Sequence, residues 1–242
     1  MRIDDYPVNK KKIFLAASKL FSQSCYADVG VRDIADEAGV KVPTVYNYYP
    51  SKEAILEDLF QFLANRITQF YDSLERIDLN DDPMNYITRM VFVTKENESE
   101  SELMRQLLRI THNEQYRSPH AAKILYDISY TKAKQCYYDF LSHLKNKGMI
   151  RCENIESFVE IFARIGFTFT MQYTRDDVTD QRPAYNQVLM DFFKVLLNYS
   201  PAEDREEKSW LPAVYAQLQA RYFHWFSYSV ADGSPAVQSP LH

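Results

Sequence analysis

The side chains best suited to chemistry lie between Val31 and Lys52, in the segment VRDIADEAGVKVPTVYNYYPSK, and that chemistry is contact with a nucleic acid. Cations, hydroxyls, an amide and aromatic rings follow one another closely there. Hydroxyl and ammonium groups bind phosphates and position a protein, whereas a few side chains aimed at base edges read sequence. We expect the exposed members to be Lys41, Thr44, Tyr46, Asn47, Tyr48 and Tyr49, with Lys52 beyond them.

Two short helices joined by a turn must position these side chains. Ile34, Val40 and Val45 are spaced to close a small core between the helices. Gly39 fits the left-handed residue that ends the first helix, because glycine has no Cβ to clash. Pro43 suits the first turn of a second helix, which we therefore start near Val42.

A further helix starts directly after the aromatic run. Ser51 is a good N-cap, and Glu53 suits the positive end of a helix dipole. Lys52 would lie beside the free N–H groups of that helix, where a phosphate is favoured. We therefore predict that Lys52 binds a phosphate.

Residues 10–56 resemble the DNA-binding domain of the TetR family of bacterial transcriptional regulators. The resemblance rests on Ile13, Ala17, Leu20, Phe21, Tyr26, Ile34, Ala35, Gly39, Val40, Thr44, Val45, Tyr46, Tyr49, Ser51, Lys52 and Leu56. It implies that Arg32, Pro43, Thr44, Tyr46, Asn47, Tyr48 and Lys52 approach the operator. Within that set it implies base reading by Arg32 and the Pro43-Thr44 pair, and phosphate contact by Tyr46, Tyr48 and Lys52. Our predicted DNA-binding set also includes Lys41.

Three residues depart from the family pattern. Cys25 replaces a usual glycine, so the turn after the first helix is made by other means or is strained. Gly30 replaces a Ser or Thr cap, at a modest loss. Lys41 replaces a frequent Ser cap and adds a cation near phosphate. The alternative for the whole segment is a small three-helix unit buried in a larger helical protein.

Charge is divided unevenly along the chain. The net charge is −5, yet residues 1–52 hold eight cations and six acids, so this segment carries +2 and the remainder −7. The cations therefore gather near the proposed DNA surface. Lys10-Lys11-Lys12 is either a basic arm that binds phosphates or a solvated helix start.

Composition favours a cytoplasmic protein that neither enters a membrane nor carries disulfides. The start MRIDDYPVNKKK is too polar for a signal peptide, and no apolar run reaches the roughly 20 residues of a membrane span. Cys25, Cys136 and Cys152 are few and widely spaced, which favours reduced thiols.

The rest of the chain indicates an all-α fold with a larger C-terminal helical domain, because no stretch alternates as a strand does. We expect residues 1–52 to form the helix-turn-helix domain, 53–231 the effector-binding and dimerisation domain, and 232–242 a flexible tail. The expected helices span 54–74, 84–95, 102–112, 119–144, 154–175, 183–199 and 209–229, with the acidic run 96–102 as a loop. Whether the helix over 209–229 packs within or across subunits is left open.

The helix starting after Asn154 is apolar on both sides, so both sides must be covered. Phe158, Phe162, Ile165 and Phe169 share one side. The opposite side carries small residues that let another helix approach, and we predict a homodimer seam there, formed by Val159, Ala163, Gly166, Phe167 and Thr170 together with residues 184–199. The resemblance implies a dimer built from four such helices. The alternative is packing of both sides within one chain.

The resemblance also implies a small-molecule effector among the C-terminal helices. The chain is rich in aromatic residues, which suit a lipophilic or aromatic ligand. The predicted wall residues are Tyr86, Met90, Met104, Leu108, His112, Tyr126, Tyr130, Tyr137, Phe162 and Phe169. For each of them, ordinary core packing is the competing interpretation.

Catalysis has little support in the sequence. The five histidines form no metal-ligand spacing, and neither a phosphate-binding glycine loop nor a nucleophile elbow occurs. We therefore expect no enzyme activity, metal or cofactor. The expected function is a regulator, most simply a repressor, that releases its operator when a small molecule binds. The alternatives are an all-helical enzyme without a motif, and a DNA-binding or assembly factor without an effector response.

Overall fold

The fold is all-α over the residues that the computed structural model describes, which are 2–76, 98–148, 150 and 152–173. The helices expected over 84–95, 183–199 and 209–229, and the tail from 232, lie outside these residues. Within the described part no helix is long and apolar enough to cross a bilayer. The boundary expected between residues 52 and 53 stays a prediction.

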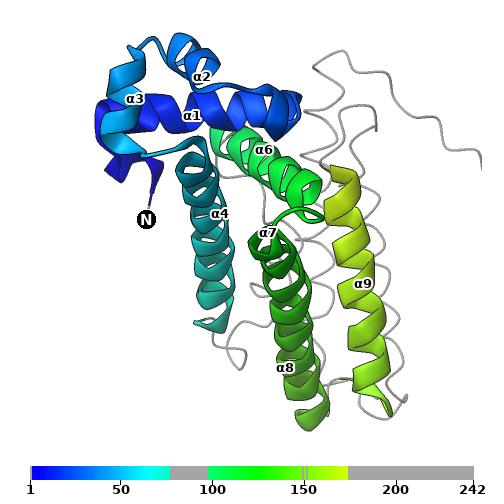
Figure 1. Cartoon of the computed structure of the whole chain (residues 1–242). Helices are drawn as coiled ribbons and strands as arrows, with labels where there is room; N and C mark the ends of the chain where they lie inside the picture. Colours follow the sequence, from blue (N-terminus) through cyan, green and yellow to red (C-terminus); the bar gives the residue numbers. More distant parts are fainter. Residues whose placement is uncertain (1, 77–97, 149, 151, 174–242) are drawn as a thin grey trace, which may run out of the picture. The chain divides into compact units, whose positions relative to one another are not determined.

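The first helices form a compact tri-helical unit (Figure 1). A 3-10 turn, η1 (Ile3–Asp5), precedes α1 (Val8–Gln23), and a second, η2 (Tyr26–Asp28), leads to α2 (Val31–Glu37) and α3 (Val42–Tyr48). Helix α1 packs against both α2 and α3, which also pack on each other. The shared core contains Ile13, Phe21, Ile34, Ala35 and Val45, each at most 2% exposed. This confirms the expected small core around Ile34 and Val45.

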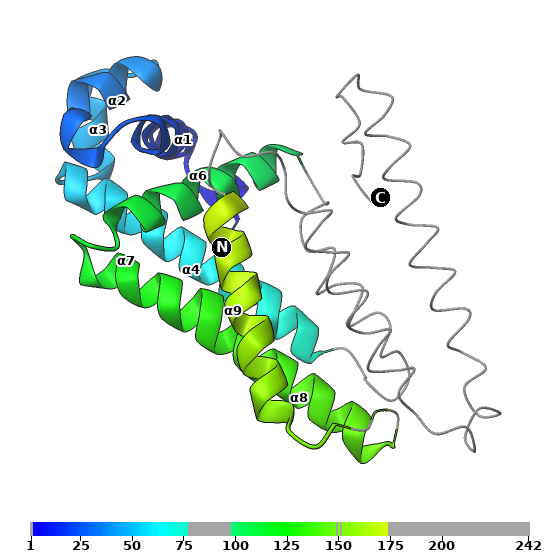
Figure 2. The same ribbon diagram turned by 90° about the vertical axis from the view of Figure 1, so that its right-hand side faces the viewer.

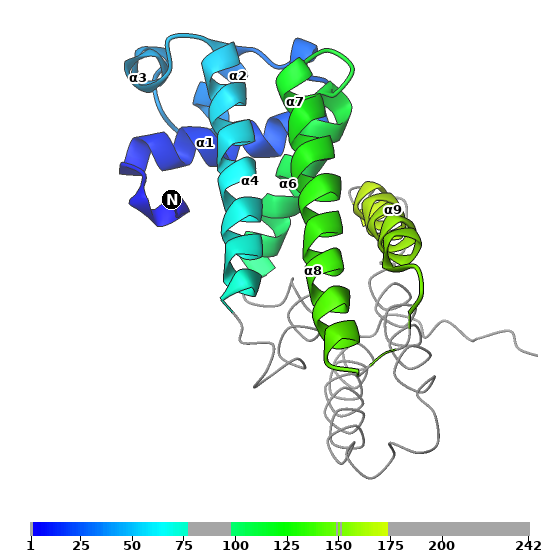
Figure 3. The same ribbon diagram turned by 90° about the horizontal axis from the view of Figure 1, so that it is seen from below.

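Helix α4 (Lys52–Glu75) leads away from this unit, as expected from the apolar period of residues 54–74. Its N-cap is Ser51, whose Oγ accepts a hydrogen bond from the Ala54 N–H at 3.2 Å. This satisfies one of the N–H groups that a helix start leaves unpaired. Further along, α4 lies beside α8 (Figure 3).

The C-terminal helices continue from α6 (Glu98–Glu114), which packs against α1 and α4. The acidic run was expected to be a loop, but residues from Glu98 onward already belong to α6. The expected helix 119–144 is present as α7 (Pro119–Lys123), a π-helical segment η3 (Ile124–Thr131) and α8 (Lys132–Asn146). Helix α9 (Ile155–Tyr173) packs along α8 (Figure 2).

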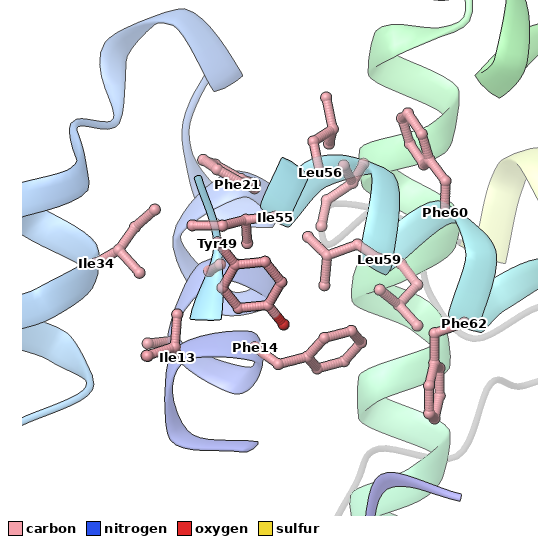
Figure 4. Packing of buried hydrophobic residues seen from close by; sticks show 14 of the residues in the cluster. Ile13, Phe14, Phe21, Ile34, Tyr49, Ile55, Leu56, Leu59, Phe60 and Phe62 are labelled. Atoms are coloured by element: carbon pink, nitrogen blue, oxygen red, sulfur yellow. The ribbon is translucent and has the colours of Figure 1, made fainter. Parts of the chain in front are cut away.

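One hydrophobic core joins the tri-helical unit to the helices that follow. Aromatic rings of α1 and α4 meet in it, because the centroids of Phe14 and Phe62 lie 5.2 Å apart (Figure 4). Tyr6, which precedes α1, meets Phe14 edge-on at 5.3 Å. Leu103 and Leu107 of α6 belong to the same cluster. A shift of α4 or α6 is therefore transmitted by direct packing to α1, because close-packed cores deform little.

Candidate nucleic-acid interface

Helix α3 buries one side and leaves the other in solvent. Val45 is 1% exposed, whereas Tyr46 is 52% and Tyr48 37% exposed. Of the other predicted DNA contacts near this helix, Lys41, Pro43 and Asn47 are exposed and Thr44 is partly buried. The expected exposure is therefore confirmed for Lys41, Tyr46, Asn47 and Tyr48, whereas Thr44 is only partly exposed. Contact with DNA stays a prediction for all of them.

Tyr49 is a correction, because it was expected to be exposed and is only 4% exposed. It is the C-cap of α3 and has an extended backbone, so its side chain no longer follows the helical period. The ring turns into the core, among Ile13, Phe14 and Leu59 (Figure 4).

The turn between α2 and α3 has the expected geometry. Gly39 has a φ of 64°. Its N–H donates to the Asp36 carbonyl at 3.1 Å, and the Val40 N–H donates to the Ala35 carbonyl at 2.9 Å. These bonds satisfy carbonyls that the helix end would leave unpaired. Helix α3 then starts at Val42 with Pro43 in its first turn, as predicted.

The departures at Gly30 and Cys25 are accommodated without strain. Gly30 is the N-cap of α2 and has no side chain to give, but its N–H donates to Asp33 Oδ2 at 2.7 Å. Cys25 has an ordinary φ of −62°. Of the two alternatives for the turn after α1, other means or strain, the structure therefore favours the first, because no left-handed residue is needed there. Arg32, in the first turn of α2, is exposed and available to a ligand.

The Lys52 ammonium makes contacts within the domain that the sequence did not predict. Its Nζ donates to the Tyr26 and Val29 carbonyls, at 2.9 Å each, and lies 4.2 Å from the centroid of the Tyr26 ring. Since an ammonium has three N–H groups, one remains for other partners. Lys52 therefore ties the start of α4 to the chain before α2, and its phosphate contact stays a prediction.

Tyr26 and Glu53 extend this junction. The Tyr26 hydroxyl donates to Glu53 Oε1 at 3.0 Å. Hydrogen bonds from the backbone, Ser51 and Tyr26 lower the pKa of Glu53. The pKa of Tyr26 is raised mainly by burial and, to a smaller extent, by the Glu53 carboxylate. Tyr26 therefore stays a neutral donor at neutral pH.

The three consecutive lysines lie within α1, which begins at Val8, so they are a helix start and not an extended arm. Lys10 Nζ lies 2.9 Å from an Asp58 oxygen, and Lys11 Nζ lies 2.6 Å from Asp4 Oδ1. An exposed ion pair such as that of Lys11 is worth little and exchanges readily for another anion, whereas the side chains of Lys10 and Asp58 are only 26% and 17% exposed. Phosphate contact by this cluster stays a prediction.

The predicted effector residues fall into two groups. On α6, Met104 and Leu108 are partly buried against the core and His112 is buried, and burial lowers the pKa of His112 to about 4. On the other helices, the Tyr137 and Phe162 rings lie 6.2 Å apart. Tyr86 and Met90 lie outside the described residues, as does the side chain of Phe169. The effector pocket stays a prediction.

Tyr130 and Tyr126 belong to a polar cluster that the sequence did not indicate. Glu160 of α9 accepts hydrogen bonds from the Tyr130 hydroxyl and from Lys134 Nζ, at 2.5 and 2.6 Å, and Arg164 Nη2 lies 2.6 Å from it. These hydrogen bonds, of which the bond from Lys134 has the largest effect, lower the pKa of Glu160 to about 2. The ring centroids of Tyr126 and Tyr130 lie 5.3 Å apart with the planes tilted by 35°, and Tyr126 is itself 59% exposed. Tyr126 is thus largely exposed in a single chain, and its contact with an effector stays a prediction.

The predicted dimer seam needs a correction on α9. Val159 and Ala163 are 0% and 1% exposed within a single chain, so they offer no surface to a second copy. Gly166 and Phe167 are partly exposed, and the side chain of Thr170 lies outside the described residues. Among the side chains of this helix that the structure describes, the exposed large apolar ones are Phe158, at 37%, and Ile161, at 55%. When both sides of a helix are apolar, its sequence does not indicate which side packs against its own chain.

No cluster of three or more histidine, cysteine or carboxylate side chains suited to a metal occurs in the described part of the chain. All three cysteines have free thiols, with Cys25 exposed and the other two buried.

Comparison with known proteins shows what the tri-helical unit is similar to. Residues 13–59 match the model of bacterial regulatory proteins of the tetR family. The HTH-type transcriptional regulator EthR of Mycolicibacterium smegmatis is 38% identical over 61 residues, which are 25% of this chain and 28% of that protein. The matched part is thus little more than a quarter of that relative's length.

Two solved structures share the fold at low sequence identity. A putative transcriptional regulator from Saccharomonospora viridis, in complex with choline, has a TM-score of 0.59 at 18% identity, covering 76% of this chain and 95% of the other. A gamma-butyrolactone receptor described as ArpA-like also has a TM-score of 0.59, at 14% identity, covering 91% and 100%. In both, the shared architecture extends well beyond the tri-helical unit.

Proposed function

We propose that this chain is a transcriptional regulator of the tetR family, not an enzyme, and that it binds operator DNA. The observation that carries the proposal is the two-sided character of α3. Val45 anchors the helix in the core, while Tyr46, Asn47 and Tyr48 project into solvent. A short helix with a fixed inner side and a polar outer side suits insertion into the major groove.

The residues around α3 divide into two roles in this proposal. Arg32 and the Pro43-Thr44 pair read base edges, because they lie in the first turns of α2 and α3. Lys41, Tyr46, Tyr48 and Lys52 hold phosphates, and Asn47 lies among them. Phosphate contacts fix register but carry no sequence information, so substitutions in the two groups have different consequences.

A homodimer gives this small interface enough specificity. Helix α3 has seven residues, so one copy spans only a few base pairs. Two copies related by a two-fold axis, about 34–36 Å apart, read two half-sites of a palindrome. Residues of α9 that stay partly exposed, together with residues 184–199, form the seam in this proposal.

The helices beyond residue 52 bind a small molecule that releases the DNA, acting in the cytoplasm. Support comes from the two structural neighbours, one complexed with choline and one described as a gamma-butyrolactone receptor. A ligand that binds better to a dimer with wrongly spaced reading helices depopulates the DNA-bound state. The aromatic residues of these helices favour a lipophilic or aromatic ligand.

Selection of duplexes from a randomised library tests the DNA-binding proposal. We expect the wild-type chain to enrich a palindromic sequence. In fluorescence anisotropy, Arg32→Ala and Thr44→Ala should lose discrimination between this duplex and a scrambled one. Tyr48→Phe should lower the affinity for both duplexes by the same factor.

Lys145→Ala, an exposed change in the last turn of α8, is the matched control and should leave both affinities unchanged. If no sequence is enriched, the proposal is refuted. If Arg32→Ala and Thr44→Ala weaken both duplexes equally, the division into readers and anchors is wrong.

A further inference from the structure

One carboxylate collects three donors from different parts of the tri-helical unit. Asp58 lies in the second turn of α4, and its side chain is 17% exposed. Its Oδ1 accepts a hydrogen bond from the Tyr6 hydroxyl at 2.8 Å, and its Oδ2 accepts one from the Tyr49 hydroxyl at 2.7 Å. Lys10 Nζ lies 2.9 Å from the same Oδ2. We call these four side chains the Asp58 junction.

The donors come from segments far apart in the sequence. Tyr6 precedes α1, Lys10 lies in its first turn, and Tyr49 is the C-cap of α3. Both phenols are at least nine-tenths buried, at 7% and 4% exposed. The Lys10 ammonium also lies 4.2 Å from the centroid of the Tyr6 ring and 5.3 Å from that of Tyr49. The junction therefore joins α1, α3 and α4 at one point.

The hydroxyl of Tyr49 adds a constraint that apolar packing lacks. A ring in a core can slide with its neighbours, but a hydrogen bond to a charged carboxylate is directional and strong in a poorly hydrated site. Burial, then the bond to Asp58, raises the pKa of Tyr49, so the phenol remains the donor. Helix α3 packs against α1 and α2, and the junction adds a tie from its C-terminal end to α4.

We propose that Asp58 is a positioning residue for DNA binding, which fixes the end of α3 through Tyr49 and the start of α1 through Tyr6 and Lys10. This inference rests on the proposed function, because α3 is the reading helix only if the protein binds DNA. Its consequence is that the junction keeps the C-terminal end of α3 fixed against the second turn of α4.

The substitutions that test this are Tyr49→Phe, which removes one hydroxyl and keeps the ring, and Asp58→Asn, which removes the charge. The matched control is Tyr26→Phe, which removes a phenol hydroxyl bonded to Glu53 in the same unit but not to α3. Two measurements are made on the full chain. The first is amide hydrogen exchange of Tyr46 to Tyr49 without DNA. The second is the ratio of affinities for the selected duplex and a scrambled duplex.

We expect the α3 amides of Tyr49→Phe to exchange about tenfold faster than in the wild type, as the loss of one charge-assisted hydrogen bond predicts, while α9 amides keep their rates. The affinity for the selected duplex should fall about tenfold and that for the scrambled duplex less than twofold. A loss of general stability alone would not change this ratio. Tyr26→Phe should leave both the α3 exchange rates and the ratio unchanged.

Unchanged α3 exchange in Tyr49→Phe would overturn the tie itself. Equal weakening of both duplexes would overturn the positioning role. Should Asp58→Asn fold poorly, Tyr49→Phe alone decides between these outcomes, because its ring fills the same space. If no duplex is selected, the proposed function is refuted and with it the role of Asp58 in DNA binding. The exchange rates would still show whether Asp58 and Tyr49 hold the end of α3 against α4.

Discussion

Replacing Lys52 by methionine removes an ammonium from between the Tyr26 and Val29 carbonyls but keeps most of the apolar stem. Hydrogen bonds to a charged donor contribute about 1.5–3 kcal/mol each, and we use the lower end because the side chain is partly exposed. The cation over the Tyr26 ring adds about 0.5–1 kcal/mol. Allowing for water that replaces part of this, we expect the free energy of unfolding to fall by about 2–4 kcal/mol.

Urea denaturation measures this loss as a lower midpoint at an unchanged slope m. The matched control is Lys41→Met, since Lys41 is exposed at the start of α3 and should change stability by less than about 0.5 kcal/mol. Equal stability of Lys52→Met and the wild type would refute the internal role that the two 2.9 Å contacts assign to Lys52.

The salt dependence of DNA binding separates the internal role of Lys52 from a phosphate contact. A lysine that neutralises one phosphate contributes about 0.9 to the slope of log affinity against log salt. We expect Lys41→Met to reduce the slope by that amount. The same reduction in Lys52→Met would mean that its remaining N–H reaches a phosphate. An unchanged slope would remove Lys52 from the phosphate contacts.

Three further substitutions test local parts of the account. Gly39→Ala should lower stability by about 1–2 kcal/mol, because φ is 64° and no neighbour within 4 Å obstructs a Cβ, so the cost is the backbone conformation alone; a change below 0.5 kcal/mol in urea would contradict this. Ser51→Ala should cost about 1 kcal/mol through loss of the α4 N-cap, also measured in urea, and no change would show that the cap is dispensable. Burial lowers the pKa of His112 to about 4 in the folded protein, against 6.5 in the unfolded chain. The contribution of neutral His112 to the free energy of unfolding is therefore complete above pH 6.5. It is lost, by up to about 3 kcal/mol, as the pH falls from 6.5 through 4. His112→Gln should flatten the pH profile of stability in that window, and an unchanged profile would refute the assignment.

Features of the fold that depend on neighbouring residues could be predicted from the sequence. Gly39 ends α2 in the left-handed region and Ser51 caps α4, because glycine and serine have local reasons to occur there. The apolar period of residues 54–74 also predicted the long helix α4 correctly. Each of these signals lies within one or two helical turns of the structure it predicts.

Features that depend on distant partners could not be predicted in this way. Asp58 bonds Tyr6, which is 52 residues away, and Lys52 bonds carbonyls 26 and 23 residues away. Tyr49 was misplaced on the exposed side because its helix ends one residue earlier. For α9, both sides were apolar, so the sequence could not show that Val159 meets its own chain.

The measurement that tests the central claim most directly is the affinity of the wild-type chain for its selected duplex and for a scrambled one, followed across salt concentrations. We expect a palindromic duplex with half-sites one helical turn apart, bound at least about a thousandfold more tightly than the scrambled one. We also expect the logarithm of the affinity to fall linearly with the logarithm of the salt concentration. Equal affinity for the two duplexes at every salt concentration would contradict the assignment of α3 as a reading helix.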